Sequence, residues 1–133
     1  MNLTQIGQIL RIDINAKNPW NDSGIDLVSG AKYDFLVPGD QKWKDASIEC
    51  DADGYSSPLL LKAFELFRRV PNQNYFKLIG AIGRSLEEPI VIGSRLEDFL
   101  AFRSGRLYCF ANDVRMMYWN NCGSIGLNVT RKA

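Results

Sequence analysis

Apolar and polar residues alternate in short runs along most of this chain, and Gly, Pro, Asn or Ser residues separate the runs. Residues 9–16 show the pattern most clearly. Period-two alternation predicts strands with one buried face. Ser29 and Gly30 stand between two such runs and predict a hairpin turn. We expect roughly seven to nine short strands in an all-β antiparallel sandwich or barrel. The expected strands beyond the first are residues 25–28, 32–37, 75–83, 90–92, 98–102, 106–111 and 124–129.

Two segments depart from this alternation. Residues 59–67 are apolar on several sides and follow Ser57 and Pro58, which are typical of a helix N-terminus. This segment is the one expected short helix, with a buried strand as the alternative. Residues 40–57 are polar, and we expect them to be irregular.

Size and charge place the chain among single globular domains. Its 133 residues suit one domain, residues 1–133, and 46% of them are hydrophobic. The net charge of +1 comes from 16 basic and 15 acidic residues. This balance argues against binding nucleic acid or anionic membranes through bulk charge. The sequence has no apolar stretch long enough to span a bilayer and no signal peptide. We therefore expect no membrane insertion and a soluble protein that is cytoplasmic or non-classically exported.

Histidine is missing from the sequence. Its absence excludes Ser-His and Cys-His nucleophile pairs, histidine general bases and histidine-ligated zinc or iron. An enzyme built from this sequence would need carboxylates, Lys, Tyr or a metal. The three cysteines, Cys50, Cys109 and Cys122, have neither zinc-ligand nor redox spacing. Cys109 lies in an apolar run, where we expect a buried, unreactive thiol.

A polar loop, residues 112–123, precedes the last expected strand. It holds Asn112, Asp113, Asn120 and Asn121 within a dozen residues. Hard cations such as Ca²⁺ take about six to eight oxygen ligands from carboxylates, amides and carbonyls. Asp113 can supply charge, and the two later asparagines can supply amide oxygens. Alternatively, these side chains cap turns and fill a tight loop. The residues alone leave both interpretations open.

Acidic residues elsewhere have simpler explanations. Residues 49–54 have the spacing that opens an EF-hand loop, but the twelfth position, which needs a bidentate Glu, is Leu60. We therefore reject an EF-hand, while an oxygen ligand from this loop to another site stays open. The adjacent acids at 87–88 and 97–98 are expected to be solvated surface rather than general acid–base pairs.

The segment from Phe110 to Gly123 resembles the calcium-dependent, galactose-binding bacterial lectins of the LecA type. The resemblance rests on Asn112-Asp113, on Asn120-Asn121 and on the spacing between them. Shorter pieces in the family's order extend it along most of the chain, at residues 23–30, 38–43, 78–83 and 104–107. It implies a jelly-roll-like β-sandwich of the galactose-binding-domain type.

The same resemblance implies a site. The implied Ca²⁺ ligands are the side chains of Asp113, Asn120 and Asn121 and the carbonyl oxygens of Met117 and of the Lys42-Trp43 region, taken as Trp43. Two adjacent sugar hydroxyls would complete the coordination shell. The residues implied to contact the sugar are Asp113, Val114, Asn120 and Asn121. The chain lacks the family's His and Gln of the middle loop, and Arg115 and Met116 replace its small Pro-Gly pair.

These features predict a non-enzymatic, calcium-dependent binding protein for galactoside-like carbohydrates. We expect a homo-oligomer, because one weak site gains from multivalency. The first alternative is a lectin-fold module for protein interaction or assembly that has lost sugar binding. The second is a hydrolase that uses Asp or Glu with a metal.

Overall fold

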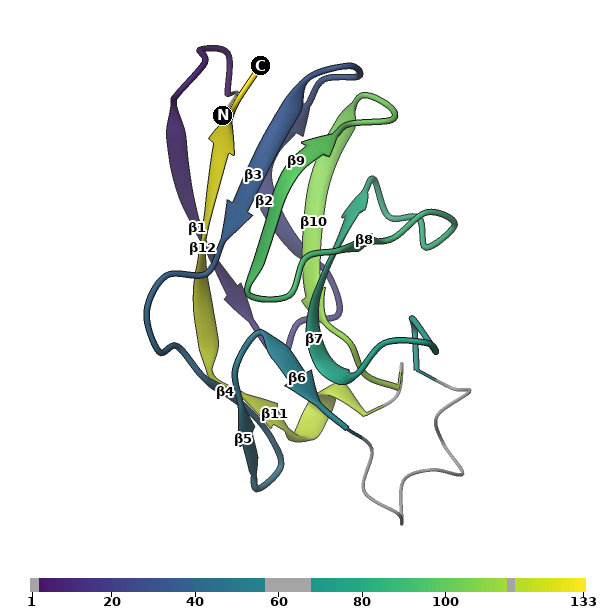
Figure 1. Cartoon of the computed structure of the whole chain (residues 1–133). Helices are drawn as coiled ribbons and strands as arrows, with labels where there is room; N and C mark the ends of the chain where they lie inside the picture. Colours follow the sequence, from purple (N-terminus) through teal and green to yellow (C-terminus); the bar gives the residue numbers. More distant parts are fainter. Residues whose placement is uncertain (1–2, 57–67, 115–116) are drawn as a thin grey trace.

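The computed structural model describes residues 3–56, 68–114 and 117–133. In this part of the chain, two antiparallel sheets pack face to face (Figure 1). The four-stranded sheet has the order β1 (Ile9–Asn15), β12 (Ser124–Arg131), β3 (Lys32–Leu36) and β9 (Arg95–Leu100). The five-stranded sheet has the order β2 (Asn21–Leu27), β10 (Gly105–Ala111), β7 (Tyr75–Ile82) and β6 (Asp53–Tyr55), and β8 (Ile90–Val91) also pairs with β7. The prediction of an all-β antiparallel sandwich is confirmed.

The core lies between the two sheets and consists of inward-facing residues of their strands. In β12, Ile125, Leu127 and Val129 are fully buried, as the alternation of this run predicts. Tyr33 of β3 belongs to the same core cluster. The five-stranded sheet contributes Ile25, Leu27, Leu78, Ile82, Leu107 and Cys109. Burying one large aliphatic or aromatic side chain stabilises the fold by about 1.5–3 kcal/mol. Burial also raises the pKa of the Cys109 thiol to about 12, so this thiol is unreactive, as predicted.

The turn at Ser29-Gly30 joins the two sheets rather than two neighbouring strands. β2 pairs with β10, whereas β3 pairs with β12 and β9, so the hairpin prediction is wrong. The turn itself forms, because the Ala31 N–H donates to the Val28 carbonyl at 3.0 Å. Both strands carry one buried face. An arch between sheets lets these two faces meet across the core, which a hairpin within one sheet does not allow.

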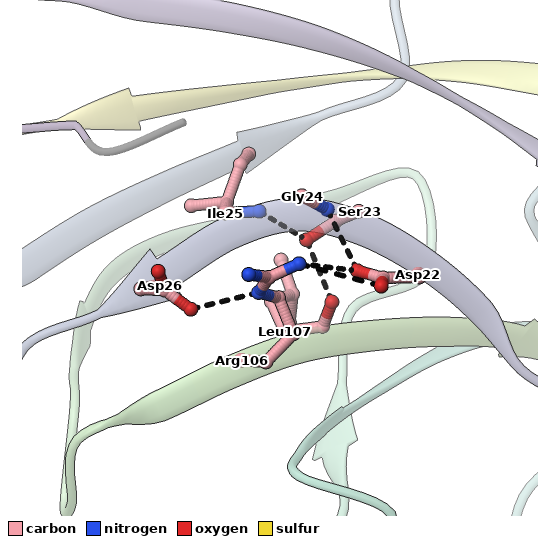
Figure 2. Close-up of polar contacts among 7 residues, drawn as sticks. All are labelled: Asp22, Ser23, Gly24, Ile25, Asp26, Arg106 and Leu107. Carbon is pink, nitrogen blue, oxygen red and sulfur yellow. Dashed lines mark hydrogen bonds and ion pairs between the residues drawn. The ribbon is translucent and has the colours of Figure 1, made fainter.

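β2 contains a bulge where residues 23–25 lie opposite Leu107. Figure 2 shows the Ser23 hydroxyl inside this bulge, where it donates to the Leu107 carbonyl at 2.6 Å and accepts from the Ile25 N–H at 3.0 Å. Gly24 supplies the positive φ, 73°, at the bulge. The Ser23 hydroxyl thus supplies hydrogen bonds where the ladder is interrupted.

Arg106 spans this bulge from the neighbouring strand. Its Nε donates to Asp26 at 2.7 Å and its Nη1 donates to Asp22 at 3.0 Å (Figure 2). The two carboxylates hold the pKa of the guanidinium above its usual value. All three side chains are partly exposed, so these ion pairs contribute little to the free energy of unfolding. Their role is to hold β2 and β10 together across the bulge.

A small third sheet lies at the end of the sandwich where β12 begins. It has the order β11 (Asn121–Cys122), β4 (Trp43–Asp45) and β5 (Ile48–Cys50), and Figure 1 shows it below the large sheets. The expectation that residues 40–57 are irregular is wrong, because β4, β5 and β6 lie within them. Each has three residues, too few to show an alternating pattern. Their first turn uses Ala46, with φ 52°, where glycine is the usual signal.

The ends of the chain lie far from this third sheet. β1 and β12 pair with Ile9 opposite Thr130 and Asn15 opposite Ser124. β11 immediately precedes β12, so the third sheet lies at the start of β12 and the C-terminus lies beyond its other end (Figure 1). β12 has eight residues, so it separates the two ends of the sandwich by roughly 25 Å at about 3.3 Å per residue.

Residues 59–67, the expected short helix, lie outside the described residues. The described ranges contain the single-turn 3₁₀ helix η2 (Tyr118–Asn120). They contain no helix with the length and apolar character needed to cross a membrane.

A substitution at Gly54 of β6 can test how closely the backbones of β6 and β7 approach each other. Gly54 has φ 74°, and a Cβ there would lie 2.1 Å from the Tyr75 carbonyl oxygen and 2.6 Å from the Lys77 nitrogen. We expect Gly54→Ala to lower the free energy of unfolding by about 2–4 kcal/mol through backbone strain and overpacking. Gly39→Ala is the matched control, because Gly39 has φ 73° but nothing within 4 Å; we expect it to cost about 1 kcal/mol. Equal losses in urea unfolding would contradict this packing.

Candidate functional site

Asn112, which follows β10, is fully buried and has hydrogen-bond partners at both ends of its amide. Its Oδ1 accepts from the Val70 N–H at 3.0 Å. Its Nδ2 lies 2.9 Å from the carbonyl oxygen of Val70, 3.2 Å from that of Gln73 and 3.1 Å from that of Asn74. Asn112 therefore organises the backbone of residues 70–74, and the turn-forming interpretation is right for this residue.

Asp113 is also buried, with 2% of its surface exposed, but only one of its oxygens is bonded. Oδ1 accepts from the Val114 N–H at 2.7 Å. Oδ2 has no hydrogen-bond partner within the described ranges. Burial first, and then the nearby charge of Asp45, raise the pKa of this carboxyl to about 7, against smaller lowering effects of the Val114 N–H and the Asn121 side chain. Asn121 therefore lies beside Asp113.

Asn120 and Asn121 are also held by hydrogen bonds, and each keeps an unbonded side-chain oxygen. The Asn121 Nδ2 donates to the Ala16 carbonyl at 3.0 Å, and the Asn120 carbonyl accepts from the Ala46 N–H at 3.0 Å. These bonds tie η2 and β11 to β1 and β4. The Oδ1 atoms of both asparagines are buried and accept no hydrogen bond from any described residue.

Whether the loop can bind a hard cation depends on these three unbonded oxygens. A buried acceptor without a donor costs about 1–3 kcal/mol. Carboxylate and amide oxygens are the ligands that Ca²⁺ prefers, and a cation would satisfy acceptors that have no hydrogen-bond donor. Asp113, Asn120 and Asn121 therefore fit the donor set that the sequence predicts.

Asp45 of β4 also lies at the candidate site, and nothing in the sequence pointed to it. It lies opposite Asn121 in the β4–β11 ladder and is 9% exposed. The Tyr55 hydroxyl donates to its Oδ2. Burial raises the pKa of Asp45, and the hydrogen bond from Tyr55 partly offsets this. No sequence signal marked Asp45, because β4 is too short to show periodicity and its pairing with β11 is not local in the sequence.

Trp43 and Met117 are the residues whose carbonyl oxygens were predicted as ligands. The Trp43 indole is buried in the core, where its Nε1 donates to the Asp51 carbonyl at 3.2 Å. The backbone of Trp43 lies against the loop, because a Cβ on Gly123 would be 3.2 Å from its Cα. The Met117 N–H donates to the Val114 carbonyl at 2.9 Å. Arg115 and Met116 lie outside the described residues.

Arg69 holds η2 in place. Its Nη1 donates to the Tyr118 hydroxyl at 2.9 Å, and this hydroxyl donates to the Ala111 carbonyl at 2.5 Å. The guanidinium carbon lies 3.6 Å from the ring centre of Phe110 and 4.4 Å from that of Trp20. Such stacking fixes the Arg69 side chain and, through it, Tyr118.

Successive residues of η2 point in different directions, because a 3₁₀ helix has about three residues per turn. Tyr118 is buried, Trp119 is 70% exposed, and Asn120 carries the buried Oδ1 described above. An exposed tryptophan is therefore the sequence neighbour of one of the candidate ligands, with its side chain directed to solvent.

The other acids lie in ordinary surroundings. Asp51 accepts from the Asp53 N–H at 2.9 Å, and Asp53 accepts from the Ser94 N–H at 2.8 Å. The first bond closes a turn and the second joins β6 to the residue before β9, so both acids have structural roles, in agreement with the rejection of an EF-hand. The described ranges hold no group of three or more Asp, Glu, Cys or His side chains suited to a metal. The candidate site is thus two carboxylates and two amides.

The raised pKa of Asp113 predicts how stability depends on pH without metal. The folded-state pKa of about 7 exceeds the usual aspartate value of 3.8, so the folded protein favours the protonated acid. Its stability contribution is complete below pH 3.8 and is lost as pH rises through 7. We expect wild type to lose up to about 4 kcal/mol relative to Asp113→Asn between pH 4 and 8. Parallel urea-unfolding profiles of the two proteins in metal-free buffer would contradict a buried carboxylate.

Comparison with known proteins supports the fold. The chain matches no protein-family model and no curated protein sequence. It is similar to the solved structure of the EclA N-terminal domain, described as a PllA-like lectin, with a TM-score of 0.70 and 18% sequence identity over 93% of this chain and 98% of that chain. At this identity the likeness concerns the fold: this chain has a lectin-like β-sandwich.

Proposed function

We propose that this protein binds Ca²⁺ and, through it, carbohydrate, without catalysing a reaction. The observation that carries the proposal is the set of three buried oxygens on Asp113, Asn120 and Asn121 that have no donor within the described residues. A polar group is rarely left in this state unless a ligand or an ion completes it. These side chains, with the carbonyl oxygens of Met117 and Trp43, would hold the ion.

Calcium suits this donor set better than a transition metal does. All the proposed ligands are hard oxygens, and the sequence has no histidine to favour zinc, copper or iron. One carboxylate, two amides and two carbonyls leave coordination positions open in a shell of about six to eight oxygens. Neighbouring hydroxyls of a sugar can fill them.

Two features support carbohydrate as the ligand class. Trp119 exposes its indole next to Asn120, and an exposed aromatic face is suited to pack against the C–H face of a pyranose ring. The similar solved structure carries the description of a lectin. A galactose-type glycan is the first candidate, through contacts to Asp113, Val114, Asn120 and Asn121. We propose a homo-oligomer, in which several weak sites act together.

The two alternatives predict different behaviour. An interaction module that has lost sugar binding would keep the fold and would bind no glycan. A metal-assisted hydrolase would need a pair of carboxylates, and the closeness of Asp45 to Asp113 is the feature that supports this alternative. The lectin-like fold and the exposed tryptophan favour binding over hydrolysis.

Calcium should stabilise the protein. If the Kd is about 10 µM, 1 mM Ca²⁺ adds about 2.7 kcal/mol, which raises the Tm by roughly 5–15 °C for a domain of this size. We expect Asp113→Ala to abolish this shift, because it removes a charged ligand. Glu97→Gln, on the exposed part of β9, is the control and should keep it. A wild-type Tm that does not change with millimolar Ca²⁺ would rule out the metal site.

A glycan array with and without chelator should then separate a lectin from an interaction module. We expect calcium-dependent binding to galactose-terminated glycans, lost with chelator. We expect Trp119→Ala to weaken glycan binding at least about tenfold, as loss of a packed aromatic side chain does, while its calcium-induced Tm shift stays at the wild-type value. An empty array despite calcium binding would favour the interaction module.

A further inference from the structure

We infer that Asp45 is a second carboxylate ligand of the cation, supplied by β4 from across the ladder that holds Asn121. This inference rests on the proposed function and adds to it a residue that carries charge. It changes the nature of the site, because the loop of residues 112–123 alone offers one carboxylate and cannot neutralise a divalent ion.

The β4–β11 pairing places Asp45 at the site. Asn121 and Asp45 are direct partners in this antiparallel ladder. Side chains of such partners lie on the same face of the sheet, with Cβ atoms about 4.5–5.5 Å apart. That face is the inward one, because Trp43 and Asp45 are buried whereas Lys44, between them, is exposed. Asp45 therefore shares this buried face with Asn121, whose Oδ1 is buried and unbonded.

The bonds of Asp45 leave one oxygen available. The Tyr55 hydroxyl donates to Oδ2, and no described residue donates to Oδ1. Tyr55 is itself fixed by stacking on Tyr75, with 5.7 Å between the ring centres. A metal-binding carboxylate typically has a hydrogen bond of this kind on its second oxygen, which sets its orientation. Tyr55 is thus a positioning residue for Asp45.

The charges around the pair point to a cation. Asp45 and Asp113 are close enough that the charge of one acts on the ionisation of the other. None of the ion pairs within the described ranges involves either carboxylate. Two buried carboxylates without a basic partner repel each other, whereas one divalent ion between them would neutralise both.

A purely structural role for Asp45 predicts the opposite behaviour on substitution. If Asp45 served only to accept the hydrogen bond from Tyr55, removing its charge would not affect a metal. If it is a ligand, Asp45→Asn relieves the repulsion with Asp113 in the metal-free protein and weakens the metal-bound one. Asp45→Asn should then raise the stability of the metal-free protein and lower its affinity for the metal.

The experiment is a calcium titration by calorimetry, with terbium luminescence, excited through nearby aromatic rings, as a second measure of binding. We expect Asp45→Asn to weaken Ca²⁺ binding at least about tenfold and Tb³⁺ binding by a larger factor, because the trivalent ion depends more on charge. In metal-free buffer at pH 8, its Tm should equal or exceed that of wild type. Glu49→Gln removes one charge from the exposed face of the same small sheet and should leave both affinities within about twofold.

The outcomes separate the two proposals. Wild type that binds Ca²⁺ and Asp45→Asn with unchanged affinity would exclude Asp45 as a ligand and leave the proposed function intact. Wild type that binds neither Ca²⁺ nor Tb³⁺ would overturn both. Tyr55→Phe covers the case in which Asp45→Asn folds poorly: it keeps the ring and the carboxylate, and we expect it to weaken Ca²⁺ about three- to tenfold through loss of orientation. Unchanged calcium affinity in Tyr55→Phe would count against a positioned Asp45.

Discussion

The pairing of β11 with β4 is the contact on which the functional end of this molecule depends. It is two residues long, Asn121 opposite Asp45 and Cys122 opposite Lys44. It is reinforced by two hydrogen bonds: the Ala46 N–H donates to the Asn120 carbonyl, and the Asn121 side-chain amide donates to the carbonyl of Ala16, directly after β1. Without it, the polar loop and the strand that carries Asp45 would have no fixed relation to each other.

A second constraint is electrostatic. The sandwich buries two carboxylates and two amide oxygens at one end and supplies only some of the donors that these groups need. In most buried sites such an arrangement would be replaced by apolar packing, which is more stable. It persists where a ligand completes it, so under the proposed function the low stability of the metal-free site would be the counterpart of its affinity for a cation. The rest of the core, two closely packed apolar faces, can sustain this local cost.

Prediction from sequence succeeded where the information is local. Alternation identified β1 and β12, which are long enough for a period of two to show, and β7 was expected from the buried apolar run of residues 75–83. The polar loop of residues 112–123 was singled out because amide and carboxylate side chains are dense within it, and the structure shows that three of them keep an unbonded oxygen.

Prediction from sequence failed where the structure depends on which strands pair with each other. The turn at Ser29-Gly30 has the sequence of a hairpin, yet its strands enter different sheets, because each buries one face against the other. β4, β5 and β6 are too short for any periodic signal. Asp45 is the clearest case: it lies 76 residues before Asn121 in the chain, and only the register of β4 against β11 brings the two side chains together.

The geometry of β12 has a consequence for how such a site could be presented. The strand runs from the candidate site to the opposite end of the sandwich, where Leu3 lies next to Arg131 of β12. Anything joined to either terminus would be held roughly 25 Å behind the site, clear of incoming ligands. Tethering several copies to a common support would turn all of their sites outward, toward a surface that carries many copies of the ligand.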